Sequence, residues 1–287
     1  NTVGNYPSRT SIISTDTTLR FVADADPYPA KAGIPLVNDG VTARVFDDST
    51  ALISDKTYDV TFDYRAGNNK LNTSTGEFNK SPIPNPEILG TNAVGIMLNG
   101  TVFHGPDFTA NTLPGGSNTA EIGFVWNSVF NGELFGEDDA GGYPENNGEY
   151  HYHSGKFLYR AWNNETFISS GSYFADTASN DGDNLRHTDG HSKIVGFAFD
   201  GYPIYGPFGY TISSDNTSGI SQQSSSYRTK PAPASGRGYL YSELPAGTFV
   251  QDYEYVDGLG TLDEYNGKYC VTPDYPEGTY AYFLSFE

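Results

Sequence analysis

Apolar and polar residues alternate with period two in two early segments, 18–23 (TLRFVA) and 58–64 (YDVTFDY). This pattern is typical of a strand that buries one face, because successive side chains of a strand point to opposite faces of the sheet. Both segments are therefore predicted to be half-buried strands. An apolar run bounded by Asp200-Gly201 predicts a buried strand at 193–199, and further strands are predicted at 41–46, 249–256 and 280–286.

A buried hairpin is predicted at 89–103 (LGTNAVGIMLNGTVF), with Asn99-Gly100 at its turn. An Asn-Gly pair accepts the left-handed backbone that a two-residue hairpin loop requires, so it is a strong short-range signal.

The segment 66–86 has almost no apolar spacing and ends in three prolines, which prevent a continuing helix or central strand. It is the clearest internal boundary in the first half of the chain. We therefore predict an N-terminal β subregion, 1–87, packed on the core, and a main domain, 88–287.

Composition supports an all-β, or β-dominated, fold with sandwich-like sheets and long loops. The 287 residues include 22 Tyr, 18 Phe, 33 Gly and 17 Pro, residue types that favour strands and turns over helices. The aromatic share of 15% supplies large side chains for a core, which argues against disorder.

The formal net charge of −19 disfavours nucleic acid and anionic membranes as partners, because both carry negative charge. Cys270 is the only cysteine, which excludes an intramolecular disulfide, and its strand-like surroundings predict a buried, inert thiol. No apolar run approaches 18 residues, so no membrane span is predicted. We expect any signal peptide or anchor to have been removed or to lie outside this sequence.

The run Tyr150-His151-Tyr152-His153 resembles the signature of the YHYH-domain family. A Gly-Gly-Tyr-Pro loop precedes it, and further similar blocks follow in the family's order, so the resemblance spans about 94–283. Relatives often carry histidine where this chain has Tyr143, and cysteine where it has Tyr265. The blocks are 141–144 with 148–149, 191–192, 196–207, 262–267, 271–276 and 278–283. The resemblance implies a surface, secreted or virion protein of bacterial, algal or phage type.

A strand at the signature would place His151 and His153 on one face, where both imidazoles can reach one ion. Imidazole suits transition metals such as zinc or copper. His191 and Asp200 are the predicted additional ligands, and the alternative is a pair of buried, hydrogen-bonded histidines without metal. His187 or Asp189 could take the place of His191 or Asp200 as an additional ligand.

His104 has no counterpart in the family blocks and is predicted to be a surface or hairpin-end histidine.

Three further sites are open on sequence alone. Glu149 or Asp200 could act as a general base if the histidines hold a catalytic zinc. Tyr202 and Tyr205 flank a proline and either present aromatic faces to a sugar or peptide or pack as a corner. Three clustered carboxylates are candidates for structural calcium, with solvated loops as the alternative. The three carboxylates are those of Asp176, Asp181 and Asp183.

Two main functions follow from these residues. The first is an extracellular, cell-surface or virion domain that uses a metal to organise loops for binding or assembly, as a homo-oligomer or within a larger assembly. The second is a metal-dependent hydrolase that uses the same histidines. A third, carbohydrate binding, would require a platform of exposed tyrosines away from the histidines, and a protein ligand remains an alternative.

Overall fold

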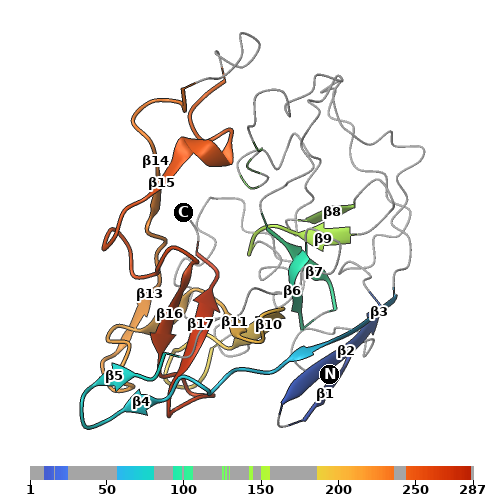
Figure 1. Cartoon of the computed structure of the whole chain (residues 1–287), viewed down its shortest axis with the longest axis vertical. Coiled ribbons are helices and arrows are strands. Elements are labelled where there is room, and N and C mark those ends of the chain that lie inside the picture. Colours follow the sequence, from blue (N-terminus) through green and yellow to red (C-terminus); the bar gives the residue numbers. More distant parts are fainter. Residues whose placement is uncertain are drawn as a thin grey trace.

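The computed structural model describes residues 10–15, 17–24, 57–80, 93–98, 100–105, 125, 127, 129, 142–144, 150–155, 186–235 and 244–285. Their regular structure is β-dominated, which confirms the predicted fold class (Figure 1). A short 3-10 helix, η3 (Val250–Asp252), opens the segment predicted as a strand at 249–256. Asp252 bends the chain there, because its carboxylate accepts hydrogen bonds from the N–H groups of Gly247 and Phe249. No helix in this part of the chain is long and apolar enough to cross a membrane.

The main sheet brings together eight strands from distant parts of the chain. They are β6 (Ala93–Met97), β7 (Val102–His104), β8 (Gly142–Pro144), β9 (Tyr150–Tyr152), β10 (Ile194–Ala198), β11 (Pro203–Tyr205), β16 (Gly267–Cys270) and β17 (Thr279–Phe283). Their order across the sheet is β16-β17-β11-β10-β6-β7-β9-β8 (Figure 1). The pairs β7 with β9 and β11 with β17 run parallel, and the other neighbours are antiparallel. The strands predicted at 193–199 and 280–286 correspond to β10 and β17.

The predicted hairpin is formed by β6 and β7, which pair antiparallel. Gly100 lies in its turn with a φ of 87°, a left-handed backbone that glycine adopts without steric cost. The N–H of Gly100 donates to the carbonyl of Met97 at 2.8 Å, and the N–H of Met97 donates to that of Thr101 at 2.9 Å. The hairpin is thus confirmed, and its second strand ends at His104.

Smaller sheets surround the main one. The N-terminal sheet has the order β1-β2-β3, and two of its strands confirm the predictions at 18–23 and 58–64, whereas 41–46 lies outside the described residues. The strands of the small sheets are β1 (Thr10–Ser14), β2 (Thr18–Asp24) and β3 (Thr57–Asp63); β4 (Leu71–Asn72) with β5 (Glu77–Phe78); β12 (Phe208–Tyr210) with β13 (Ile220–Gln222); and β14 (Tyr227–Thr229) with β15 (Tyr253–Tyr255).

Apolar side chains join the N-terminal sheet to the main sheet. Leu19 and Phe21 of β2 share a buried cluster with Ile96 of β6 and Phe197 of β10. The ring centroids of Phe21 and Phe197 lie 6.1 Å apart. Burying side chains of this size contributes about 1.5–3 kcal/mol each, so the contact is a substantial part of the core.

Cys270 belongs to a second core cluster, under β16 and β17, and is 1% exposed. Burial raises the pKa of its thiol to about 12, so the side chain stays protonated. A buried, protonated thiol is a poor nucleophile and a poor metal ligand, as the sequence predicted.

Gly201, in the turn between β10 and β11, touches the end of the N-terminal sheet. Its φ is 91°, and its carbonyl accepts a hydrogen bond from the N–H of Arg65 at 3.0 Å. A Cβ added at Gly201 would lie 2.0 Å from the carbonyl oxygen of Asp63. Only glycine fits this contact between the two sheets.

Gly201→Ala is therefore expected to lower the free energy of unfolding by more than about 2 kcal/mol, because a steric clash adds to left-handed backbone strain. The matched control is Gly76→Ala, at a φ of 73° with open space around the added Cβ; strain alone should cost about 1 kcal/mol. Urea unfolding followed by circular dichroism measures both. Equal losses in the two variants would contradict this role for Gly201.

Candidate metal centre

The signature histidines lie on β9 and directly after it, beside β7. Val102 of β7 pairs with His151 of β9 in parallel register. His104 stands two residues after Val102, and His153 stands two residues after His151. Because strand side chains alternate, the three imidazoles share one face of the sheet, while Tyr152 is buried in the core cluster.

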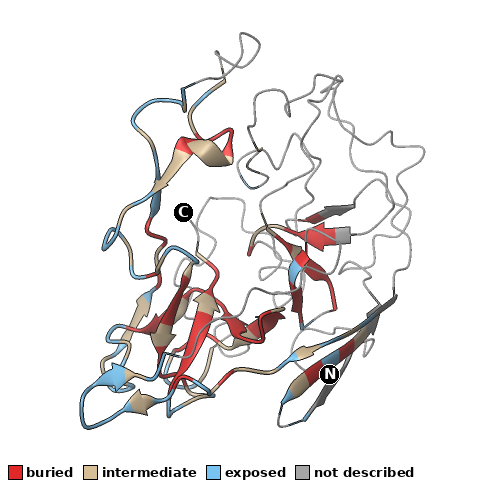
Figure 2. Cartoon of the chain, in the orientation of Figure 1, coloured by how far each residue is buried: buried red, intermediate tan, exposed pale blue. Residues whose placement is uncertain are grey.

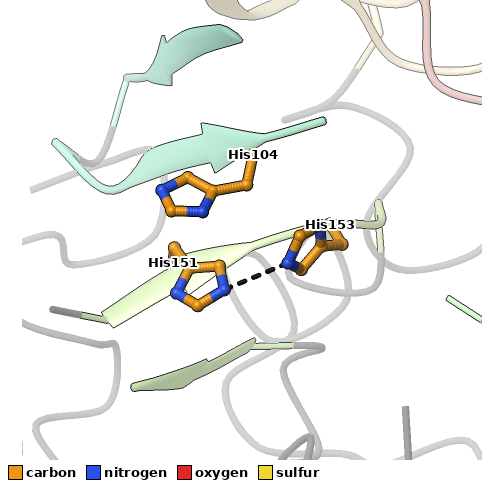
Figure 3. A group of neighbouring side chains, drawn as sticks. All are labelled: His104, His151 and His153. Atoms are coloured by element: carbon orange, nitrogen blue, oxygen red, sulfur yellow. Dashed lines mark hydrogen bonds between the residues drawn. The ribbon is translucent and has the colours of Figure 1, made fainter. Parts of the chain in front are cut away.

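The three rings are in mutual contact (Figure 3). His104 and His151 stack, with centroids 4.1 Å apart and 20° between the ring planes. His153 stands edge-on to both rings, 5.7 Å from His104 and 4.8 Å from His151. The Nε2 atoms of His151 and His153 are 3.0 Å apart. One ligating nitrogen from each ring can be chosen so that all three lie within 4.8 Å of one another.

A backbone carbonyl fixes the tautomer of His153. Its Nδ1 lies 2.8 Å from the carbonyl oxygen of Gly105, which can only accept, so Nδ1 carries the proton and donates it. In the neutral ring, the lone pair of Nε2 then faces His151 and accepts a hydrogen bond from the Nε2–H of that ring. Metal-ligating histidines typically donate their other ring N–H to a carbonyl or carboxylate in this way.

The donor set fits a transition metal. Bonds of about 2.0–2.1 Å in a tetrahedral site separate neighbouring nitrogens by about 3.3 Å. The 3.0 Å between the Nε2 atoms of His151 and His153 differs from this by only a few tenths of an ångström. Because calcium and magnesium prefer oxygen, a group of three imidazoles favours zinc, copper or a similar ion.

Burial keeps the His104 imidazole neutral, which is the form that binds a metal ion. His104 and His151 are 4% and 0% exposed, and His153 is partly exposed. Burial, and then the neighbouring His153, lowers the pKa of His104 from 6.5 to about 3. A neutral imidazole is the form that ligates a metal, so protons do not compete for this ligand near neutral pH.

His191 and Asp200, the predicted additional ligands, lie outside this group. His191 is fully buried, with its ring 5.1 Å from Tyr205 and its Nδ1 donating to the carbonyl of Ser192 at 2.7 Å. Asp200 accepts hydrogen bonds from the hydroxyl of Tyr282 and from a backbone N–H. Burial raises the pKa of Asp200, and both side chains are held by the core.

The substitute ligands have other partners as well. The Nε2 of His187 is 3.1 Å from Asp274, and Asp189 accepts hydrogen bonds from the hydroxyl of Tyr210 and the N–H of His191. The loop that carries His187 and Asp189 is therefore held by hydrogen bonds of its own.

Tyr202 and Tyr205 are 1% and 0% exposed, so they pack as a corner and present no face to a ligand. Glu149 and the calcium candidates lie outside the described residues; the latter are Asp176, Asp181 and Asp183.

The sequence did not identify His104 as a member of this group. His104 ends the hairpin, as predicted. The other prediction, a surface histidine, is wrong because the side chain is only 4% exposed. His104 joins the group because it stands two residues after Val102, which pairs with His151. This parallel pairing of β7 with β9 joins segments that are distant in sequence. No local pattern predicts such a pairing.

Buried neutral histidines predict acid sensitivity in the metal-free protein. Burial lowers the pKa of His191 from 6.5 to about 4, and His104 is lowered further. Below pH 6.5 the unfolded chain binds protons that the native state rejects, so stability is full above pH 6.5 and falls as the pH drops toward 4. Each histidine should contribute about 1 kcal/mol per pH unit in this range.

Urea midpoints in chelator between pH 7.5 and 5 measure this loss. His191→Asn keeps a donor for the Ser192 carbonyl and should flatten the pH dependence. An unchanged slope in this variant would show that other groups cause the sensitivity.

Comparison with protein families matches residues 72–287 to the family described as YHYH protein. Neither the curated proteins nor the solved structures gave a match. The match covers most of the chain and includes the signature strand and the histidine group. The chain belongs to the YHYH protein family.

Proposed function

We propose that this chain is an extracytoplasmic domain in which a transition metal, zinc or copper, stabilises the pairing of β7 with β9 near the edge of the main sheet. The observation that carries the proposal is the convergence of His104, His151 and His153 from two strands. The metal joins β7 to β9 and gives this edge a fixed geometry for binding or assembly. Location outside the cytoplasm is supported by the resemblance to surface and secreted proteins and by the acidic composition.

The joint that the metal would reinforce is short. The register of β7 with β9 contains two residue pairs, Val102 with His151 and Phe103 with Tyr152. Parallel pairing is also slightly less stable per residue than antiparallel pairing. A metal bound by His104 on one strand and by two histidines on the other adds strong bonds across this joint. Structural zinc contributes directly to folding free energy in this way.

A second candidate function, a metal-dependent hydrolase, is favoured by the number of ligands. Three protein ligands with a bound water are typical of catalytic zinc, and His153 is the partly exposed member of the group. When bound, such an ion would lower the pKa of its water to about 7. The test is hydrolysis of p-nitrophenyl acetate or p-nitrophenyl phosphate by the zinc-loaded protein. Activity that is lost in His153→Ala would favour the enzyme, whereas no turnover would leave the structural role.

Metal content tests the main proposal. Protein purified without a histidine tag should contain close to one zinc or copper per chain by plasma mass spectrometry. His104→Ala and His153→Ala should each reduce metal affinity at least about tenfold, because each removes one ligand. His187→Ala is the matched control, since this histidine lies outside the group, and it should keep its metal.

Metal should also stabilise the fold. At a free concentration of 100 times its dissociation constant, a ligand of the native state contributes about 2.7 kcal/mol, which corresponds to roughly 5–10 °C in Tm. The shift should appear in wild type and in His187→Ala and should be clearly smaller in His104→Ala at the same metal concentration. Calcium as the only bound metal, or a metal affinity that is unchanged in His104→Ala, would overturn the proposal.

A further inference from the structure

The ribbon formed by β14 and β15 carries tyrosines on one face. Tyr227 lies opposite Tyr255 in the antiparallel register, and Arg228 lies opposite Glu254. Because side chains alternate, Tyr227, Tyr255 and Tyr253 share one face. Arg228 and Glu254 form an ion pair at 2.9 Å on the other face, where the cation is neutralised.

Strand β14 is exposed along its length, in contrast to the largely buried strands of the main sheet such as β17 (Figure 2). Tyr227 and Tyr255 are each 36% exposed and meet edge to face, with centroids 5.6 Å apart. Tyr265 is 63% exposed, and its backbone lies next to Tyr227, because the hydroxyl of Tyr227 donates to the carbonyl of the adjacent Glu264 at 3.0 Å. We call these three residues the tyrosine platform.

Hydrogen bonds hold the platform in place before any ligand arrives. The hydroxyl of Tyr255 donates to Asp257 at 3.3 Å, and the N–H of Tyr265 donates to Asp263 at 2.9 Å. The rings of Tyr227 and Tyr255, whose hydroxyl groups are bonded, lose little conformational freedom on binding, which favours affinity. The same bonds bring carboxylates to the border of the platform.

We propose that Tyr227, Tyr255 and Tyr265 form a docking surface for a neutral polysaccharide. Aromatic faces pack against the apolar C–H faces of sugar rings. The carboxylates of Asp257 and Asp263 border the platform, and that of Asp257 can accept hydrogen bonds from sugar hydroxyls. The negative charge of these carboxylates would repel sulfated and uronic acid glycans.

A protein partner fits this surface less well. Stable protein interfaces bury about 800 Å² per partner around a core depleted in charge, whereas carboxylates border this small group of rings. The platform also lies apart from β7 and β9, so it is independent of the metal centre (Figure 1).

Affinity gel electrophoresis tests the proposal with three neutral polymers, hydroxyethyl cellulose, laminarin and galactomannan, and with sulfated carrageenan. Wild type should be retarded by at least one neutral polymer and not by carrageenan. Tyr255→Ala and Tyr265→Ala should each weaken the binding about tenfold. Ile212→Ala is the matched control, because Ile212 is 54% exposed outside the platform, and it should bind like wild type.

Tyr255→Phe separates ring stacking from hydroxyl bonding and should keep most of the affinity, while circular dichroism verifies that each variant is folded. His104→Ala should bind the polymer like wild type if it folds, so failure of the metal proposal leaves this result readable. Retardation by no neutral polymer, by carrageenan alone, or equally in wild type and the tyrosine variants would overturn the proposal. Self-association abolished by Tyr255→Ala, without polymer binding, would identify an interface between copies instead.

Discussion

The parallel pairing of β7 with β9 is the constraint on which the candidate metal centre depends. A shift of one residue in this register would move His151 and His153 to the opposite face from His104. The register is supported on both sides, because β7 is also the second strand of a tight hairpin and Tyr152 is anchored in the core. The geometry of the site therefore follows from how β7 and β9 pack against the neighbouring strand and the core.

Polar groups inside this core are held by specific partners. Asp263 accepts the hydroxyl of Tyr280 through both carboxylate oxygens, at 3.0 and 2.9 Å, and Asp200 accepts that of Tyr282. Buried polar groups are stable when such partners satisfy them. Asp200 and Asp263 thus supply structure around β11 and β17, while the histidine group lies on the other side of the sheet order, at β7 and β9.

Local patterns were enough to predict several elements. Period-two alternation located β2 and β3, the Asn-Gly pair located the hairpin, and the same alternation brought His151 next to His153. The third imidazole was not predictable, because His104 joins the group only through a pairing between distant segments. His191 resembles a ligand in sequence, but its burial between aromatic rings depends on tertiary packing.

The central claim is that three imidazoles of one chain ligate one ion. X-ray absorption spectroscopy of the metal-loaded protein tests it most directly, because the fine structure reports the type and number of ligand atoms. The account predicts a first shell with three imidazole nitrogens at about 2.0 Å, reduced to two in His104→Ala. A shell of oxygen alone, or one that is identical in wild type and His104→Ala, would contradict it.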